Sequence, residues 1–148
     1  MLFIVLDPGK STGMTVMKDG KYIFGCTVED YNWTWLMEKV ESLAARHKNV
    51  TVITEEFRVY PGMGAQQALQ PAWSAQINGM LEYFVYLNSR KGKNYHFIKQ
   101  WASTAKTYSS DDKLKQHGLW KGTKHQKDSA RHYIFYIENT RNKEMKRA

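Results

Sequence analysis

The chain of 148 residues contains one cysteine, Cys26, three prolines and no long apolar run. A single cysteine excludes an intrachain disulfide framework and a zinc site built from cysteines alone. Within Tyr22–Val28 it is best interpreted as a small apolar strand residue. The N-terminal apolar run Leu2–Leu6 is too short for a secretion signal or a membrane helix. We therefore expect a soluble, cytoplasmic protein without membrane contact.

Acidic side chains are scarce between Arg90 and Lys127, a stretch with ten basic and two acidic residues, whereas residues 1–89 carry seven and nine. Almost the whole net charge of +8 therefore lies in one stretch. A localised basic surface suits a polyanion, because Lys and Arg displace the counterions of phosphates. A solvated lysine-rich loop would explain the charge alone equally well.

Apolar runs bounded by turn signals predict five strands. They are Leu2–Asp7, Gly13–Met17, Tyr22–Thr27, Val50–Thr54 and Asn94–Ile98, with a hairpin turn at Asp19-Gly20. Helical spacing predicts four helices. They are one from Trp33 after the N-cap Asn32, one from Pro71 through about Leu87, a short one around Asp112–His117, and one from about His125 to Glu138.

The order βββ-α-β-α-β-α predicts an α/β fold in one domain over residues 1–140. Three strands joined by tight turns form an antiparallel meander, and the two strands that follow helices run parallel to the first. We expect a five-stranded mixed sheet, three antiparallel strands and then two parallel ones, flanked by helices. Residues 141–148 form a basic tail that we expect to be frayed and flexible.

Two strands end in a carboxylate, Asp7 and Glu55. If these strands are parallel neighbours, both groups lie at the end of the sheet where α/β folds place ligands. A buried carboxylate is costly unless its charge is neutralised, although Asp7 alone fits a turn hydrogen bond equally well. Glu56 is the alternative inward carboxylate, because adjacent strand residues face opposite ways.

His125 and Asp128 share one face of the last predicted helix, three residues apart. With Asp7 and Glu55 they favour a two-metal phosphodiesterase, since clustered carboxylates need cations to offset their repulsion. Oxygen ligands favour two Mg²⁺ ions, for which Mn²⁺ can substitute. His125 either binds metal or transfers a proton. His132, one turn beyond Asp128, either supports the site, faces DNA or packs as a partly buried helix residue.

Three segments resemble the RuvC Holliday junction resolvases, which belong to the RNase H-like nuclease superfamily. The opening IVLDPGKSTGMTV is similar to the first strand of the family, with its Asp-Pro-Gly and Thr-Gly, and TVITEEF resembles the second acidic strand. HQKDSARHYIFY resembles the last helix, with its His-x-x-Asp or Asp-x-x-Asp pair, and DDKLKQHGLW is similar to resolvases encoded by bacteriophages. The resemblance extends from Asp7 to about Ile137.

This resemblance implies an RNase H-like fold and a metal-dependent endonuclease that nicks four-way DNA junctions in recombination and repair. It assigns metal binding and catalysis to Asp7, Glu55, His125 and Asp128. It also implies a homodimer with two active sites, which we expect to form through the helix around Trp73–Leu87.

DNA contact beyond the metals is expected from the basic stretch and from aromatic side chains. The lysines are Lys91, Lys93, Lys99, Lys106, Lys113, Lys115, Lys121, Lys124 and Lys127. Phe57 or Tyr60 corresponds to the family aromatic that stacks on a base. Trp101, Tyr108 and Trp120 either stack on bases exposed at a junction or pack in the core.

Three other functions are compatible with parts of the sequence. A sugar kinase or actin-like ATPase shares an Asp-x-Gly-x-Thr-like first hairpin, but it needs two duplicated halves and this chain provides one. A related RNase H-like nuclease would act on forks, flaps or RNA hybrids. A non-catalytic branched-DNA binding protein would have little use for four costly polar positions.

Overall fold

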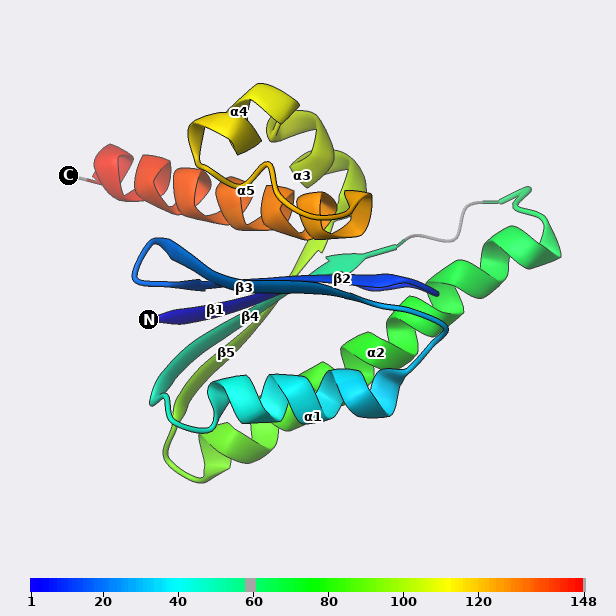
Figure 1. The fold of residues 1–148 in the computed structure, drawn as a ribbon, viewed down its shortest axis with the longest axis horizontal. Coiled ribbons are helices and arrows are strands. Elements are labelled where there is room, and N and C mark those ends of the chain that lie inside the picture. Colours follow the sequence, from blue (N-terminus) through cyan, green and yellow to red (C-terminus); the bar gives the residue numbers. More distant parts are fainter. Residues whose placement is uncertain (58–60, 148) are drawn as a thin grey trace.

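The structure, a computed structural model, describes residues 1–57 and 61–147 (Figure 1). At its centre is a five-stranded sheet in the order β3-β2-β1-β4-β5. The strands are β1 (Leu2–Asp7), β2 (Thr12–Lys18), β3 (Lys21–Val28), β4 (Asn49–Glu56) and β5 (Asn94–Trp101). The first three pair antiparallel, whereas β4 lies parallel to β1 and β5 parallel to β4. The predicted α/β class and mixed sheet are confirmed.

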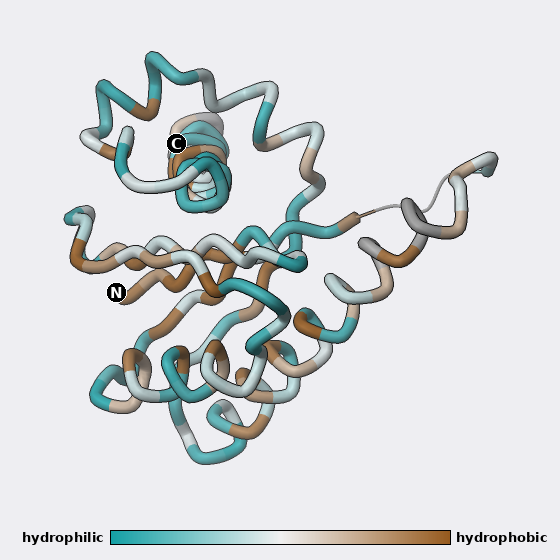
Figure 2. The backbone as a smooth tube through the Cα atoms, turned by 45° about the vertical axis from the view of Figure 1, so that its right-hand side comes forward, coloured by the Kyte–Doolittle hydropathy of each residue, from teal (hydrophilic) through white to brown (hydrophobic). Residues whose placement is uncertain are grey.

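Helices cover both faces of the sheet (Figure 1). On one face lie α1 (Trp33–Ala44) and α2 (Ala65–Arg90), and on the other α3 (Ala102–Tyr108), α4 (Asp111–Gln116) and α5 (Lys124–Arg147). Figure 2 shows apolar segments concentrated along the strands, between these helical layers. None of the described helices is long and apolar enough to cross a membrane.

Side-chain alternation along β1 builds a core on each face. Ile4 belongs to the cluster that contains Leu36 of α1 and Leu81 of α2, whereas its neighbour Val5 packs in the cluster of Ile134 from α5. Because both faces are covered, the strand is a continuous apolar run until it reaches Asp7.

The structure contains the helix cap and the hairpin turn that the sequence predicts. The side chain of Asn32 caps α1 by accepting a hydrogen bond from the backbone N–H of Trp35, at 3.3 Å. Asp19 and Gly20 have φ values of 49° and 79°, which is the left-handed pair required by a type I′ hairpin between β2 and β3.

Two helix boundaries predicted from the sequence are wrong. Helix α2 begins at Ala65 and not at Pro71, because residues 65–70 are good helix formers and the helix tolerates one missing N–H. Helix α5 ends at Arg147 and not at about Glu138, so it includes residues 141–147 of the predicted tail. Its apolar pattern ends near Ile137, and the polar turns beyond it gave no periodic signal.

Helix α3 was not predicted. It has seven residues and buries only one of them, Ala105, so it leaves no apolar period in the sequence. Its importance lies in what it carries, because Lys106 points from it into the candidate site.

Glu138 of α5 connects to helices α3 and α4 through hydrogen bonds. It accepts hydrogen bonds from the Tyr108 hydroxyl at 2.7 Å, the Lys113 ammonium at 2.9 Å and, across to its other oxygen, His117 Nε2 at 3.1 Å. The hydrogen bond from Tyr108, followed by those from Lys113 and His117, lowers the pKa of Glu138 to about 2.

We expect Glu138→Gln to reduce the free energy of unfolding at neutral pH by about 1–2 kcal/mol, because three polar partners lose a charged acceptor. Since the folded-state pKa is depressed, this contribution is complete above pH 4.5 and is lost as the pH falls toward about 2. Urea unfolding at several pH values should therefore show wild type and variant converging in acid. A difference in the free energy of unfolding that stays constant down to pH 3 would contradict this role of the Glu138 carboxylate.

Candidate active site

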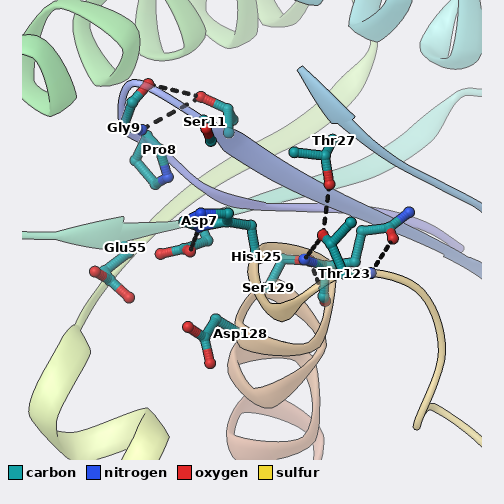
Figure 3. A network of polar contacts seen from close by, with 12 residues as sticks. Asp7, Pro8, Gly9, Ser11, Thr27, Glu55, Thr123, His125, Asp128 and Ser129 are labelled. Carbon is teal, nitrogen blue, oxygen red and sulfur yellow. Dashed lines mark hydrogen bonds and ion pairs between the residues drawn. The ribbon is translucent and has the colours of Figure 1, made fainter. Parts of the chain in front are cut away.

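The four residues predicted for the site converge at one end of the sheet (Figure 3). Asp7 ends β1, and Glu55 lies at the same end of the parallel strand β4, where Leu6 is in register with Thr54. His125 and Asp128 come from the first turns of α5. The imidazole Nδ1 of His125 lies 3.2 Å from Asp7 Oδ2.

Three of these groups are buried carboxylates. Asp7 is 5% exposed, Asp128 8% and Glu55 0%. Asp7 and Asp128 border a cavity of about 330 Å³, and Glu55 lies buried behind it against Lys106. The cavity is lined by Asp7, Pro8, Gly9, Lys10, Ser11, Phe57, Lys106, Lys124, His125 and Asp128. Such a concentration of buried negative charge is unfavourable for the fold unless cations neutralise it.

Glu55 and Glu56, the two alternatives for the second carboxylate, lie on opposite sides of β4. Glu55 faces the cluster, whereas Glu56 faces the other side of β4 and forms an ion pair with Lys99 at 3.3 Å. The strand alternation that created the ambiguity also separates the two carboxylates.

Lys106 is the cation that the sequence did not place here. Its ammonium nitrogen lies 2.9 Å from Glu55 Oε2 and 3.6 Å from both Asp7 Oδ1 and Asp128 Oδ2. Lys106 was predicted to contact DNA as one of many surface lysines. Because helix α3 was not predicted, nothing in the sequence indicated that Lys106 lies among the carboxylates.

The electrostatics follow from burial and from these contacts. Burial raises the pKa of Asp7, with the charge of Glu55 adding to the effect. The pKa of Glu55 is lowered, because hydrogen bonds and charge from His132 and Lys106 outweigh its burial. The hydrogen bond to the Asp7 carboxylate raises the pKa of His125. Burial lowers the pKa of Lys106, but the negative charges of Asp7 and Glu55 outweigh burial, so the pKa of Lys106 is raised.

Two residues behind the site hold its carboxylates. Arg131 donates to Asp128 Oδ1 at 3.3 Å and also bonds Asp111 and the Ser109 carbonyl, which ties Asp128 to the start of α4. His132 is fully buried and contacts Glu55. The sequence suggested a supporting role for His132 as one of three options and gave no signal for Arg131.

Close backbone packing sets the position of helix α5. A Cβ atom on Gly13 would lie 2.0 Å from the carbonyl oxygen of His125, so β2 and the first turn of α5 approach closely only because residue 13 is glycine. Thr123 and Gln126 form a capping box, with Gln126 N–H donating to Thr123 Oγ1 and Thr123 N–H to Gln126 Oε1. Thr15 and Ser129 share a hydrogen bond at 2.7 Å.

The donor set suits a hard divalent cation. Its ligand atoms are carboxylate oxygens with one imidazole, and Glu55 Oε1 is buried without a hydrogen-bond partner. As placed, no group of three or more His, Cys, Asp and Glu side chains among the described residues could hold a metal ion. Lys106 lies among the same carboxylates, so a metal ion there would have to displace its ammonium group.

Of the other predicted DNA-contacting lysines, one lines the cavity and several are held elsewhere. Lys124 borders the site. Lys113 is bound to Glu138, and Lys93 contacts the Ala45 carbonyl at the opposite end of the sheet, beside Lys91.

Lys115 and Lys127 lie over the ring of Trp120, at 5.2 and 3.9 Å from its centroid, and Lys121 lies over Tyr22. This exposed Trp120 is 40% accessible, so it is not a core residue.

Among the aromatic residues predicted to stack on bases, one lines the cavity and others lie elsewhere. Phe57 lines the cavity and a second hollow of about 300 Å³ that it shares with Trp101, whereas Tyr60 lies outside the described residues. Tyr108 packs edge-on against Phe135, with its hydroxyl on Glu138.

No protein-family model and no curated protein sequence matches the chain. Solved structures do. Thermus thermophilus RuvC in complex with Holliday junction substrate superposes with a TM-score of 0.65 at 15% identity, over 95% of this chain and 96% of that one. A second Thermus thermophilus RuvC structure gives 0.61 at 15% identity, over 95% and 97%. The chain has the RuvC fold.

The fowlpox virus Holliday junction resolvase is also similar, with a TM-score of 0.54 and 14% identity over 94% of this chain and 99% of the viral one. The RuvC fold expected from three short motifs is therefore confirmed over nearly the whole chain, despite the low identity.

Proposed function

We propose that this protein is a divalent-metal-dependent endonuclease that cleaves Holliday junctions. The observation that carries the proposal is the convergence of Asp7, Glu55, Asp128 and His125 from three separate elements at one end of a RuvC fold. One RuvC of this fold has been captured with a Holliday junction substrate. Such a function places the protein in the cytoplasm of a bacterial or phage-infected cell.

The chain offers candidate metal ligands, a candidate phosphate site and an aromatic side chain at the cavity. Asp7, Glu55, Asp128 and His125 would hold two Mg²⁺ ions, which when bound activate water and stabilise the leaving oxygen of a phosphodiester. Lys124 borders the cavity at the start of α5, where the positive end of the helix dipole favours a phosphate. Phe57 lines the same cavity and would stack on a base beside the scissile bond.

We also propose a homodimer formed through α2. That helix exposes Tyr83, Tyr86 and Leu87, at 61%, 51% and 37%, on the segment predicted to dimerise. Exposed large apolar side chains gathered on one helix mark a contact surface. Scattering or sedimentation that gives only monomer, with and without junction DNA, would refute this arrangement.

A synthetic four-way junction with separately labelled strands tests the function. We expect paired nicks on two opposing strands with Mg²⁺ or Mn²⁺, none with EDTA, and no cleavage of the matched linear duplex. Cleavage of flaps, forks or RNA hybrids in place of the junction would keep the metal chemistry and replace the substrate. Tight junction binding without any cleavage would leave a structural branched-DNA binding protein.

Lys106→Met should strengthen Mn²⁺ binding to the DNA-free protein. The ammonium group lies between the three carboxylates that would take the ion, so removing its charge removes a competitor. We expect Mn²⁺ to bind about tenfold more tightly, a change of roughly 1.4 kcal/mol. Titration followed by Mn²⁺ electron paramagnetic resonance measures this, with Lys99→Met as the control because Lys99 pairs with Glu56 outside the cluster. Equal or weaker binding by Lys106→Met would contradict the competition.

A further inference from the structure

His132 is buried between two polar partners. Its Nε2 lies 3.0 Å from Glu55 Oε2, and its Nδ1 lies 2.9 Å from Gln100 Oε1. The imidazole and Glu55 are both 0% exposed, and Gln100 is 7% exposed. Gln100 is in register with Glu55 on the neighbouring strand β5, so the three side chains link β5, α5 and β4.

This arrangement is more than packing. A buried imidazole is unfavourable unless its nitrogens are hydrogen-bonded, and an aliphatic side chain would fill the same space without that requirement. Here both ring nitrogens are bonded, which fixes the plane of the ring. His132 contacts the site through Glu55, so any effect on chemistry must pass through that carboxylate.

The contact makes the two oxygens of Glu55 unequal. Oε2 bonds His132 and lies 2.9 Å from the Lys106 ammonium, whereas Oε1 is buried without a partner. The glutamate side chain has three rotatable bonds, so an unsupported Glu55 would reorient, and its Oε1 would not keep one position. The bond to His132 is the side-chain contact of Glu55 that would remain if a metal ion displaced Lys106.

We propose that His132, oriented by Gln100, is a positioning residue that would hold the Glu55 carboxylate in place for a metal ion. This inference rests on the proposed metal-dependent function. The hydrogen bond to Glu55 is the reason for a histidine on the buried side of α5 one turn after Asp128. We also expect changes at β5, outside the acidic cluster, to weaken metal binding.

The test is Mn²⁺ affinity of the DNA-free protein, measured by electron paramagnetic resonance of the free ion. We expect His132→Leu to weaken Mn²⁺ binding by about 10–100-fold, as is usual when a group that orients a metal ligand is removed. Gln100→Leu should weaken it by several-fold. His132→Gln, whose amide can still donate to Glu55, should bind Mn²⁺ closer to wild type than His132→Leu does.

Tyr95→Phe is the matched control. It also lies on β5 and loses a buried hydrogen bond, from its hydroxyl to the Ala44 carbonyl at 2.7 Å, but at the other end of the strand. It should be destabilised like Gln100→Leu while keeping the wild-type Mn²⁺ affinity. Junction binding in Ca²⁺ should stay within about twofold of wild type for every variant, while the Mn²⁺ concentration that gives half-maximal cleavage rises.

The outcomes separate the two proposals. Wild-type Mn²⁺ affinity in folded Gln100→Leu and His132→Gln, and in His132→Leu if it folds, would overturn the positioning role and leave the metal-dependent function intact. The same loss of affinity in Tyr95→Phe would also overturn it, because the effect would then follow stability. A wild-type protein that binds no Mn²⁺ and cleaves no junction would overturn both.

Discussion

Replacing Asp7 with asparagine is expected to reduce the rate of junction cleavage by at least about 10²–10³-fold, the usual effect of removing one electrostatic group from a reacting centre. Asp7 is the carboxylate that both lines the cavity and contacts His125, at 3.2 Å. Asparagine keeps its shape, so the loss isolates the charge.

The same substitution should leave the fold intact or strengthen it. Burial raises the pKa of Asp7, so the ionised form is disfavoured in the folded state and its destabilising effect is present at neutral pH. Asp7→Asn removes that effect, and we expect its melting temperature in EDTA to equal or exceed that of wild type by a few degrees. Active sites commonly sacrifice stability in this way.

Single-turnover cleavage of a labelled junction and thermal unfolding of the same samples measure both effects. Glu56→Gln is the control, because Glu56 lies outside the cluster and pairs with Lys99. If Asp7→Asn cleaves within tenfold of wild type, Asp7 is not a ligand. If Glu56→Gln is the inactive variant, the assignment of the second carboxylate is wrong.

Gly13→Ala should slow the proposed junction cleavage without altering an ionisable group. The added Cβ would meet the backbone of His125 at 2.0 Å, and backbone atoms at that distance must move apart. The first turn of α5 would shift away from β2, carrying His125 and Asp128 away from Asp7. We expect a loss of stability of about 1–3 kcal/mol, typical of overpacking, and at least about 10²-fold slower cleavage.

Gly79→Ala is the matched control. Gly79 lies within α2 with nothing within 4 Å of an added Cβ, so alanine there should stabilise the helix by roughly 0.5–1 kcal/mol. Because α2 is also the proposed dimer helix, sedimentation must first show the wild-type oligomeric state of this variant, whose cleavage we then expect to be unchanged. Unfolding and cleavage measured on both variants distinguish a shift of α5 from a general effect of adding a methyl group. Wild-type activity in Gly13→Ala would show that the approach of α5 to β2 is not needed.

Local signals predicted much of the fold because they act over short stretches of chain. The hairpin at Asp19-Gly20, the cap at Asn32 and the apolar run that ends in Asp7 each depend on neighbouring residues. The boundary errors have the same origin. Helix α2 continues through Pro71 and α5 beyond Ile137, where an apolar period no longer marks the helix.

The candidate site was predicted in part. Parallel strands bring Asp7 and Glu55 to one end of a sheet, and helical spacing puts His125 and Asp128 on one face, so each pair followed from periodicity. The approach of α5 to the strand ends, which joins the two pairs, depends on tertiary packing. Phe57 is also at the cavity, although Tyr60 lies outside the described residues.

By itself, the sequence determined the order of the strands and of every helix except α3, the mixed sheet and the acidic positions, because repeating apolar patterns and strand ends are local properties. Only the tertiary structure decided which charges meet. Lys106 on an aperiodic helix, Arg131 beside Asp128 and His132 against Glu55 are brought together by packing between elements distant in the chain. These contacts are strong because the groups are buried together in a region of low dielectric constant. That shared burial cannot be predicted from the spacing of residues within a single segment.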